Sequence, residues 1–414
     1  MVTNTLVTPY YSSGIRERFL LHALHPPAAT KNVKYAELDY EFDPIAYQKR
    51  SLARVATEKL PMTLPKGWPA AVHGLLAWSG KDFPDETPFI YMISDEENQE
   101  IANALACFSK LGIKPEKVTP ELFPLPILQR RLQKIQDEIY HGRGLAILRG
   151  LNIDSLSDEQ LTVVYLGVTC YVAGVRGKQD QRGSMIMHVL SRDDEDAVHN
   201  KLVEKPYHTD TSCDCLCLLT KACAASGGRS LISSAWNVYN ILAATRPDLI
   251  HTMMQANWPF DTSGRDPPYV NRPILYLQDG KIIMNVSRRQ LCGHPNDPRT
   301  PGIPGLTEAQ AEALDAIHAI AREHEIKTTM QQGDIRFLNN MALLHRRETF
   351  YDDDQSKRHL MRLWLHNPKQ CWGLPRTLRI AWARIFEDME REAHWDMSPV
   401  REGGRILRTG QSCD

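Results

Sequence analysis

The stretch Phe337-Leu338-Asn339-Asn340-Met341-Ala342-Leu343-Leu344-His345 decides the fold, because this apolar run delivers a histidine at its C-terminal end. Gly333-Asp334 precedes it as a turn, and together they predict a strand over residues 335–344. Residues 326–330 and residues 359–366 are also expected to be strands. Short strands separated by turns are typical of an antiparallel sandwich or jelly roll.

Capping boxes earlier in the chain mark where helices begin. Ser94-x-x-Glu97, Ser157-x-x-Gln160 and Thr307-x-x-Gln310 each place a hydroxyl three residues before a Glu or Gln. This spacing lets the two side chains satisfy amides that the first helical turn leaves without partners. The boxes and one amphipathic stretch predict helices at about residues 95–107, 127–140, 159–172 and 308–322.

Further strands are predicted at residues 144–148, 186–190 and 214–224. Asp279-Gly280 is a type I′ turn signal between two apolar runs, so residues 273–286 are expected to form a hairpin. Helices thus cluster early in the chain and strands late. This order predicts an α+β protein with an antiparallel core.

The ends of the chain differ from its centre. Residues 1–93 are rich in Pro and aromatic residues without clean periodicity and are expected to be an irregular arm. We expect an irregular and helical N-terminal region (1–140) packed on the core, a core domain (141–368), and a C-terminal segment (369–414). That last segment is expected to carry a helix at residues 382–392 and a mobile tail.

Composition excludes several classes of protein. The 414 residues are 42% hydrophobic and 24% charged, and 49 Lys+Arg against 50 Asp+Glu leave a net charge of -1. No global field therefore draws the chain to nucleic acid or to an anionic membrane. The longest uncharged apolar run, residues 161–175, is shorter than a membrane span. Nine cysteines without a CxxC pair, and no secretory signal pattern, predict a cytoplasmic protein.

The segment Val203-Glu204-Lys205-Pro206-Tyr207-His208-Thr209-Asp210-Thr211 contains a His-x-Asp pair. Residues i and i+2 of a strand project from the same face, so His208 and Asp210 could hold one ion. The pair alone is weak evidence, since His394 and Asp396 repeat it, and two solvated polar residues at a strand end would look the same. Only the first pair is followed by a strand that delivers another histidine.

Two arginines lie in or next to the strand expected at residues 359–366, after His345. Arg358 and Arg362 are four residues apart, so both lie on one face. Two histidines and one carboxylate form the facial triad of non-haem Fe(II), which leaves coordination positions open for a co-substrate and dioxygen. An inward-pointing arginine can form a bidentate pair with a carboxylate.

Taken together, His208-Thr209-Asp210, His345 and Arg358-x-x-x-Arg362, with Gly333-Asp334 before the distal strand, resemble the taurine-dioxygenase-like branch of the Fe(II)/2-oxoglutarate oxygenases. The resemblance covers roughly residues 140–368. It implies a double-stranded β-helix, which is a jelly roll, with flanking helices and an elaborated N-terminal region. It also implies His208, Asp210 and His345 as the iron ligands.

For the co-substrate, the resemblance implies that Arg358 holds the distal carboxylate of 2-oxoglutarate. Arg362 would lie nearer the iron and face the other end of the co-substrate or an acidic substrate, so the choice between the two arginines stays open. Ser230, in Gly227-Gly228-Arg229-Ser230, is the counterpart of a hydroxyl that also binds this carboxylate in the family. Glu204 and His188 are further candidates for contacting substrate.

The implied activity is that of an oxidoreductase, a dioxygenase that uses Fe(II), 2-oxoglutarate and dioxygen. It would oxidise an unactivated C–H bond of a small molecule and release succinate and CO2. Hydroxylation is the default outcome, with desaturation or ring closure as variants. Amino acids, small acids and intermediates of secondary metabolite biosynthesis are the expected substrates. No catalytic residue beyond the metal centre, no nucleic acid and no membrane are expected, and the oligomeric state is open.

Two other functions fit parts of the pattern. A cupin-like metal enzyme would use the triad without needing the two arginines, and a non-catalytic sandwich would carry the triad by accident. Cys213, Cys215 and Cys217 alternate on one strand face and are expected to be core packing. Residues 352–354, Asp-Asp-Asp, are expected to form a solvated loop. His359 has the opposite parity to the arginines and should face away from the metal.

Overall fold

The computed structural model describes residues 34–190, 204–263, 267–295, 297–402 and 405–406. Its helices are α2 (Pro44–Thr57), α3 (Asp95–Lys110), α4 (Gln129–Tyr140), α5 (Asp158–Thr169), α6 (Ala235–Thr245), α7 (Pro247–Met253), α8 (Arg288–Cys292), α9 (Glu308–Glu323) and α10 (Arg379–Phe386). The strands up to the long hairpin are β1 (Ile90–Met92), β2 (Leu145–Arg149), β3 (Val175–Arg176), β4 (Met187–Leu190), β5 (Cys215–Ala222), β6 (Ser226–Gly227), β7 (Ser230–Ser234), β8 (Trp258–Asp261), β9 (Tyr269–Arg272), β10 (Leu275–Gln278) and β11 (Lys281–Met284). The later strands are β12 (Ile326–Thr328), β13 (Ile335–Asn339), β14 (Leu343–Arg347), β15 (Phe350–Tyr351), β16 (His359–His366), β17 (Arg401–Glu402) and β18 (Arg405–Ile406).

Two sheets form the core of the jelly roll. The major sheet runs in the order β1-β2-β13-β5-β16-β3, and β4 also pairs with β16. The minor sheet runs in the order β12-β7-β14. Apart from the parallel pair β1–β2, the ladders of both sheets are antiparallel. The predicted fold class, an α+β protein with a jelly-roll core, is confirmed.

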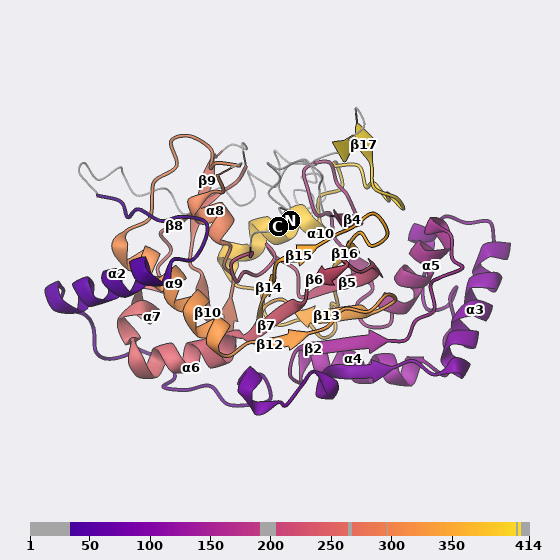
Figure 1. Cartoon of the computed structure of the whole chain (residues 1–414), viewed down its shortest axis with the longest axis horizontal. Helices are drawn as coiled ribbons and strands as arrows, with labels where there is room; N and C mark the ends of the chain where they lie inside the picture. Colours follow the sequence, from indigo (N-terminus) through magenta and orange to yellow (C-terminus); the bar gives the residue numbers. More distant parts are fainter. Residues whose placement is uncertain (1–33, 191–203, 264–266, 296, 403–404, 407–414) are drawn as a thin grey trace, which may run out of the picture.

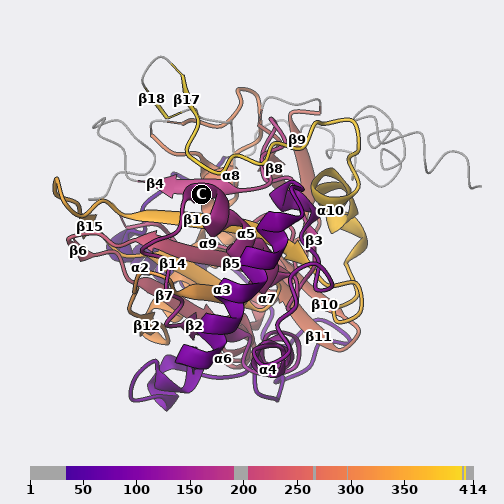
Figure 2. The same ribbon diagram turned by 90° about the vertical axis from the view of Figure 1, so that its right-hand side faces the viewer.

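Successive side chains of β5 and β13 point to opposite faces of the major sheet. Cys215, Cys217 and Phe337 pack with α3, α4 and α5 in one buried cluster. Leu216 and Leu338 pack in another, with residues of the minor sheet. Figures 1 and 2 show α3, α4 and α5 together on one side of the strands. Cys213 lies before β5 and packs in the second cluster. The three cysteines are therefore buried core residues, as predicted, but Cys213 does not share the face of the other two.

The run from residue 335 to residue 347 is two strands rather than one. The prediction of a single strand over residues 335–344 was wrong at its centre, because β13 ends in the major sheet and β14 begins in the minor sheet. Asn339 makes the break possible, since its Oδ1 accepts the amide of Met341 at 3.0 Å. The chain crosses between the sheets at this point and arrives at His345 on the other side.

Two helices, α6 and α7, lie where no helix was predicted, whereas α9 matches the helix expected at residues 308–322. α6, α7 and α9 pack with β10 and β11 in a cluster that includes Leu231 and Leu344 of the minor sheet, and they lie on the left in Figure 1. The expectation that helices come early and strands late is therefore wrong, because these helices fall between β7 and β12. These helices cover the apolar side chains on the outer face of the minor sheet.

Helix α2 falls inside the region expected to be irregular. It packs on α9 through charge rather than through an apolar stripe: Arg54 Nη1 lies 2.5 Å from Glu312 Oε2, and Arg50 Nη1 lies 2.6 Å from Asp315 Oδ2. Ile45 and Leu52 meanwhile remain exposed. Apolar periodicity could not predict this helix, because its inward face is basic.

Local signals were read correctly at several other places. All three capping boxes form, with both of their hydrogen bonds present. Asp279 and Gly280 take φ values of 50° and 73°, as the type I′ turn between β10 and β11 requires. The helix expected at residues 382–392 is instead α10, which begins earlier and ends at Phe386. Among the described residues, no helix is long and apolar enough to cross a bilayer.

Candidate metal centre

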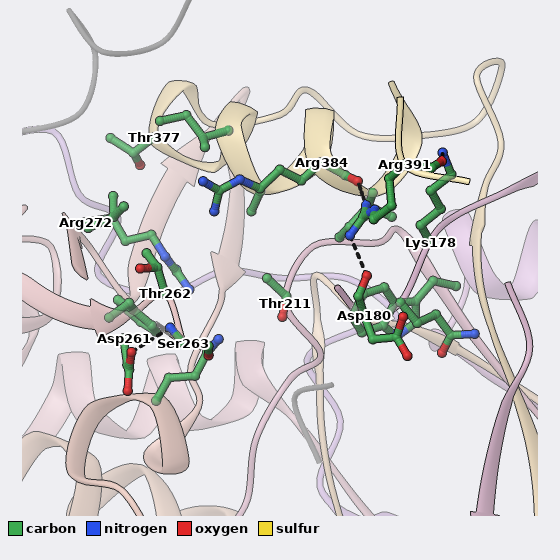
Figure 3. Close-up of a pocket in the computed structure, with 18 residues that line it drawn as sticks. Lys178, Asp180, Thr211, Asp261, Thr262, Ser263, Arg272, Thr377, Arg384 and Arg391 are labelled. Atoms are coloured by element: carbon green, nitrogen blue, oxygen red, sulfur yellow. Dashed lines mark hydrogen bonds between the residues drawn. The ribbon is translucent and has the colours of Figure 1, made fainter. Parts of the chain in front are cut away.

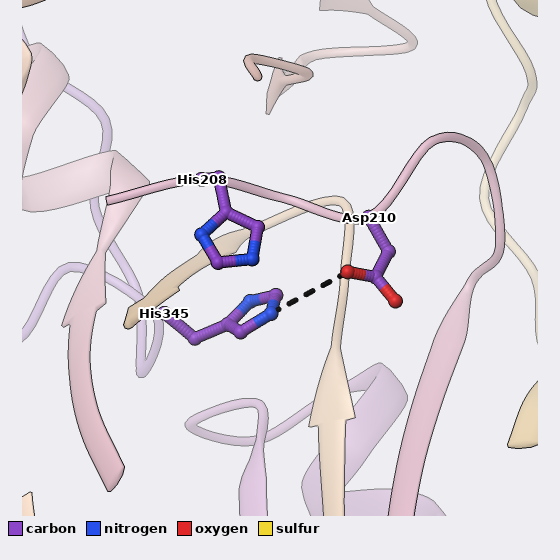
Figure 4. Close-up of side chains that lie close together, drawn as sticks. All are labelled: His208, Asp210 and His345. Atoms are coloured by element: carbon purple, nitrogen blue, oxygen red, sulfur yellow. Dashed lines mark ion pairs between the residues drawn. The ribbon is translucent and has the colours of Figure 1, made fainter. Parts of the chain in front are cut away.

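The structure brings His208, Asp210 and His345 together, although 137 positions separate the two histidines in the sequence. One ligand atom from each lies within 4.8 Å of the other two. Asp210 is fully buried, His208 is 9% exposed, and the ring centroids of the two histidines are 4.4 Å apart. Figure 4 shows the two rings facing each other with the carboxylate beside them.

Backbone pairing fixes the spacing of the two histidines. The amide of His208 donates to the carbonyl of His345 at 3.1 Å, and the amide of His345 donates back at 2.9 Å. The two residues form an isolated antiparallel bridge in the middle of β14. Their Cβ atoms therefore leave neighbouring backbones on the same face.

The imidazole of His208 is oriented by its own loop. Its Nδ1 lies 2.9 Å from the carbonyl of Pro206, so Nδ1 carries the proton and Nε2 presents a lone pair. Burial, and secondly the neighbouring His345, lower the pKa of His208 to about 3. A neutral imidazole with one fixed nitrogen is the form that ligates a metal.

The two oxygens of the Asp210 carboxylate have different neighbours. Its Oδ2 accepts the indole Nε1 of Trp364 at 2.5 Å and lies 3.2 Å from Arg362 Nη1. Its Oδ1 lies 3.5 Å from His345 Nε2, on the side where the imidazoles converge. One oxygen is thus held by the protein while the other faces the position between the histidines.

The loop that carries Asp210 is anchored by Asn340. The Oδ1 of Asn340 accepts the amide of Asp210 at 2.8 Å, and its Nδ2 donates to the carbonyls of Asp210 and Cys213, each at 3.1 Å. The expectation that Asn340 bonds backbone is confirmed. Because Asn340 lies where the chain crosses from β13 to β14, one residue couples the crossing to the loop of the first two ligands.

A cavity beside these ligands, here called the metal-adjacent cavity, is lined by both histidines, Arg362, Arg358 and Ser230. Its basic lining side chains are Lys205, Arg336, Arg346, Arg347, Arg358 and Arg362. None of the described residues that line it carries a carboxylate. Such a lining suits an anionic ligand with more than one acidic group.

Within this cavity Arg362 and Arg358 lie at different places. Arg362 donates from Nε to Gln179 Oε1 at 2.8 Å in addition to its contact with Asp210, so it lies at the metal end. Arg358 lies over the ring of Phe350, with its Nη2 3.9 Å from Met330 Sδ. It is further positioned by Asp352, whose Oδ1 accepts the Arg358 amide at 3.0 Å.

The Gly227-Gly228 turn shapes the wall next to Arg358. Both glycines have positive φ, 70° and 75°, which other residues adopt only with strain. A Cβ at position 228 would meet Arg358 Nε at 3.4 Å. The turn therefore lets the backbone pass close to the guanidinium and leads directly into Ser230 on β7.

A second cavity, here called the α10 cavity, lies next to the residues that bond Asp210 and Arg362. Trp364 and Gln179 line it, and these are the residues that bond Asp210 and Arg362. Thr211, which follows Asp210 in the chain, lines it as well. Figure 3 shows α10 spanning the top of this cavity.

The α10 cavity is lined by four basic and two acidic side chains. Asp261 is already bonded, by the amide and hydroxyl of Thr300 and the amide of Ser263. Figure 3 shows Arg272 and Arg384 on one side of the cavity and Asp180 on the other. The apolar part of the lining includes Phe260, which lies 3.4 Å under the Arg272 guanidinium.

Two predicted substrate contacts lie elsewhere. Glu204 accepts Arg346 Nη1 at 2.8 Å and is not among the residues lining either cavity. Residues 204–207 form no strand, so the parity that favoured Glu204 does not apply. His188 lies 2.8 Å from His359, Nδ1 to Nε2, and 2.9 Å from the carbonyl of Asp396, and it also lines neither cavity.

The acidic triplet is only partly solvated. Asp352 is 8% exposed and bonds the amide of Arg358, so the expectation of a solvated loop is wrong for this residue. Its neighbour Asp353 caps its own turn, accepting the amides of Gln355 and Ser356. The acidic residues position the arginine strand and do not form a metal site with described neighbours.

A second group with metal-ligand chemistry, Asp214, His366 and Cys371, has a simpler explanation. Asp214 Oδ2 accepts hydrogen bonds from Tyr140, His366 and the amide of Asn367. Its lone pairs are used by protein donors, so the group is a hydrogen-bonded junction between β5 and the end of β16.

Three residues of the site were missed from sequence, namely Trp364, Gln179 and Arg336. Trp364 and Arg336 lie on the arginine-bearing face of the major sheet. The register places Arg336 opposite Leu218, which lies opposite Arg362. Parity alone places Trp364 with Arg362, two residues apart, and could have found it. The position of Arg336 requires the strand pairing.

A jelly roll that holds two histidines and one carboxylate beside a cationic cavity defines the class of non-haem Fe(II) oxygenases that use a 2-oxo acid. The chain belongs to the family described as "Taurine catabolism dioxygenase TauD, TfdA family", whose model matches residues 112–364. The family resemblance inferred from the motifs is thereby confirmed. The protein is an Fe(II)/2-oxoglutarate-dependent dioxygenase that oxidises a small molecule, with dioxygen as the second co-substrate.

Two relatives are similar over most of the chain. Taurine hydroxylase-like protein SAT17 of Stachybotrys chartarum is 33% identical over 340 residues, which cover 78% of this chain and 88% of that protein. FR-33289 synthase of Streptomyces rubellomurinus is 25% identical over 315 residues, covering 71% and 90%.

Solved structures show the same fold at lower identity. Asparagine oxygenase in complex with Fe(II), 2S,3S-3-hydroxyasparagine and succinate has a TM-score of 0.53 at 14% identity, over 67% of this chain and 93% of that one. The non-haem iron oxygenase OrfP in complex with Fe and alpha-ketoglutaric acid has a TM-score of 0.52 at 15% identity, with coverage of 67% and 93%.

Proposed function

We propose that His208, Asp210 and His345 hold the Fe(II) and that 2-oxoglutarate lies in the metal-adjacent cavity. The observation that carries the proposal is the convergence of the three ligand atoms within 4.8 Å at one end of a cavity whose charged lining is basic. Two histidines and one carboxylate match the donor set of non-haem Fe(II). The alternative of a cupin-like enzyme without a 2-oxo acid gives the arginines no role.

Arg358 is the anchor for the distal carboxylate of 2-oxoglutarate, with Ser230 beside it. Support comes from position, since Arg358 lines the cavity away from the metal, next to Phe350 and Met330. Arg362 is held by Asp210 and Gln179 at the metal end. Its role is to hold Asp210 in place, a second-sphere contact of the kind that tunes metal affinity.

When bound, iron together with 2-oxoglutarate and dioxygen supplies the oxidising power that turns a substrate C–H into an alcohol, and 2-oxoglutarate leaves as succinate and CO2. The side chains bind, orient and exclude water. Trp364 and Arg362 hold one oxygen of Asp210, so that the carboxylate binds through the other. Hydroxylation is the proposed outcome.

The substrate is proposed to occupy the α10 cavity. This cavity approaches Asp210 through Trp364 and Thr211, so a bound molecule lies close to the metal. Basic side chains outnumber acidic ones in its lining, and Asp261 is engaged by Thr300. A small molecule with an acidic group, such as an amino acid, a sulfonate or a phosphonate, fits this charge balance with Arg272 and Arg384 at its acidic end.

Anaerobic addition of Fe(II) and 2-oxoglutarate tests the metal site. We expect a visible charge-transfer band in the wild-type protein and its loss in His208→Ala and in Asp210→Ala. Arg131→Leu on α4, which lines neither cavity, is the control and should keep the band. A band that survives in either ligand variant would move the metal elsewhere.

A matched panel tests the substrate class. Small carboxylates, sulfonates and phosphonates are compared with the neutral amides or esters of the same skeletons, and succinate release is measured. Acidic members should raise 2-oxoglutarate turnover while their neutral counterparts do not. Stimulation by the neutral members alone would contradict an anionic substrate and leave the metal site unaffected.

A further inference from the structure

Arg336 has a buried guanidinium group to which the proposed function assigns no role. It lies on β13 in the middle of the major sheet and is fully buried. Its strand neighbour across the ladder is Leu218, and the next is Arg362. Residues directly opposite in a sheet share a face, so Arg336 points to the same side as Arg362. It also lines the metal-adjacent cavity.

The bonding of this guanidinium is incomplete. Its Nη2 donates to the carbonyl of Thr329 at 2.9 Å, whereas Nε and Nη1 have no hydrogen-bond partner among the described residues. Burial lowers the pKa of Arg336 from its usual value. A buried charge without a counter-ion is costly, and buried cations are normally paired. The side chain therefore lacks a partner that a ligand could provide.

The nearest acidic residue cannot be that partner. Asp334 already accepts Arg149 Nε at 3.0 Å and Arg149 Nη2 at 2.8 Å, and its Oδ2 also accepts the amide of Gln331. Both oxygens are thus engaged in a fork-like pair with another arginine. A structural ion pair with Asp334 does not account for the position of Arg336.

Arg336 and Arg358 lie at the same end of the cavity. Arg336 bonds Thr329, and Arg358 contacts the next residue, Met330. Cys223 donates to the Met330 carbonyl, and both guanidinium groups act on its thiol. Burial raises the pKa of that thiol, while the two arginines act in the opposite direction. Two cations therefore flank one small volume away from the metal.

We propose that Arg336 is a second anchor for the distal carboxylate of 2-oxoglutarate, acting together with Arg358. The inference rests on the proposed binding of 2-oxoglutarate in this cavity and adds a residue that sets co-substrate specificity. A carboxylate placed between two guanidinium groups supplies the missing acceptor for Nε or Nη1. The consequence is a strong preference for a 2-oxo diacid over a 2-oxo monoacid of the same length.

The test compares 2-oxoglutarate with 2-oxopentanoate, which has the same chain length and lacks the distal carboxylate. Affinities of wild type and Arg336→Leu are measured by anaerobic titration of the charge-transfer band with Fe(II) present. Leucine removes the charge and keeps an apolar side chain. We expect about a 10- to 100-fold loss of affinity for 2-oxoglutarate, as charge-assisted bonds to a carboxylate imply. Affinity for 2-oxopentanoate should stay within about threefold.

Thermal unfolding distinguishes a role of Arg336 in ligand binding from a purely structural role. Without ligand, Arg336→Leu should be at least as stable as wild type, because an uncompensated buried charge is removed. Saturating 2-oxoglutarate should then stabilise the variant less than it stabilises wild type. A variant that loses stability by the same amount with and without ligand, at an unchanged affinity ratio, would overturn the proposal.

Arg336→Lys keeps the charge without the planar fork and decides the matter if the leucine variant fails to fold. Its preference for 2-oxoglutarate over 2-oxopentanoate should fall at least about threefold. Arg131→Leu on α4 is the matched control and should keep the wild-type ratio. Absence of any band in wild type would reject the proposed function itself. A wild-type band with an unchanged ratio in both Arg336 variants would reject only the second anchor.

Discussion

The two cavities that meet at Asp210 are built from different parts of the chain. The metal-adjacent cavity is lined by β4, β5, β7, β13, β14, β15 and β16 and by loops between them, all within the span of the family model. The α10 cavity is closed by Thr377, Ile380 and Arg384, which lie beyond residue 364, where that match ends. The cavity proposed for the co-substrate thus lies within the matched jelly roll, and the cavity proposed for the substrate is completed by a segment outside that match.

Charge separates the cavities as clearly as origin does. The metal-adjacent cavity has basic but no acidic side chains among the described residues that line it. The α10 cavity mixes both signs with apolar side chains such as Phe260 and Ile380. A cavity for one fixed diacid needs strong and simple electrostatics, whereas a cavity for a particular substrate needs a shaped and mixed surface.

The largest effect is expected from Arg358→Leu, which affects only the metal-adjacent cavity. Losing a fork that binds a carboxylate should weaken 2-oxoglutarate binding by about 100-fold or more. Titration of the charge-transfer band measures this loss. The band intensity at saturation should match wild type, because the iron ligands are untouched. A change in substrate KM at saturating 2-oxoglutarate would break the separation of the two cavities.

Trp364→Phe acts at the wall between the cavities. The ring is kept, but Asp210 Oδ2 loses the indole donor at 2.5 Å. Removal of a contact that orients a metal ligand should weaken Fe(II) affinity by about 10- to 100-fold. Competition with a metal-sensitive dye measures the affinity. Normal iron binding in the variant would mean that Arg362 alone fixes this oxygen.

Arg384→Leu sharpens the comparison from the other side. We expect KM for an acidic substrate from the panel to rise about tenfold, as the loss of one charged contact implies. The affinity for 2-oxoglutarate should not change. Arg379→Leu, on the same helix and paired with Glu387, is the matched control because it does not line the cavity. Equal effects of the two variants would reduce the role of Arg384 to holding α10.

The smallest effect concerns the face of β16 that is turned away from both cavities. His359 Nε2 lies 2.8 Å from His188 Nδ1, and burial lowers the pKa of His359 to about 3. As pH falls below about 6.5, the unfolded chain binds a proton here that the folded protein does not. Stability therefore falls, by at most about 1.4 kcal/mol per pH unit, until pH approaches the folded pKa.

His359→Gln keeps a donor toward His188 and removes this titration. Urea unfolding at pH 6.5 and pH 5 should show a smaller acid-induced loss of stability in the variant than in wild type. Ligand affinities at pH 7 should be unchanged, because this face contacts neither cavity. An identical pH dependence would indicate that other buried groups, such as His318 with its lowered pKa, dominate acid sensitivity.

The sequence predicted what depends on neighbours along the chain. Ser94 and Glu97 sit in one helical turn, so their capping box could be recognised from spacing alone. The three residues that converge in the structure were singled out as a motif, because the His-x-Asp pair and the strand ending at His345 each have a local signature. The arginine pair was visible for the same reason.

What could not be predicted depends on partners far away in sequence. The inner face of α2 is basic, and Arg54 on this face is paired with Glu312, 258 residues later in the chain. The sequence near α2 gives no sign of this partner. Asn339 and Asn340 interrupt the apolar run where the chain crosses between the two sheets, but the sequence does not show that Asn340 bonds the loop of Asp210. From the sequence, Arg336 is only a charged residue within an apolar strand. The pairing of β13 and β16 with β5 places it on the same face as Arg362.

The mutual backbone hydrogen bonds of His208 and His345 have a consequence for how the protein acquires its metal. The two imidazoles are brought together when the polypeptide folds, so the entropy of gathering them is spent before any ion arrives. Metal uptake then requires little rearrangement. A chelator should remove iron and leave the far-UV circular dichroism unchanged, and fresh Fe(II) should restore turnover on mixing. We therefore expect that repeated cycles of iron removal and addition leave the protein folded.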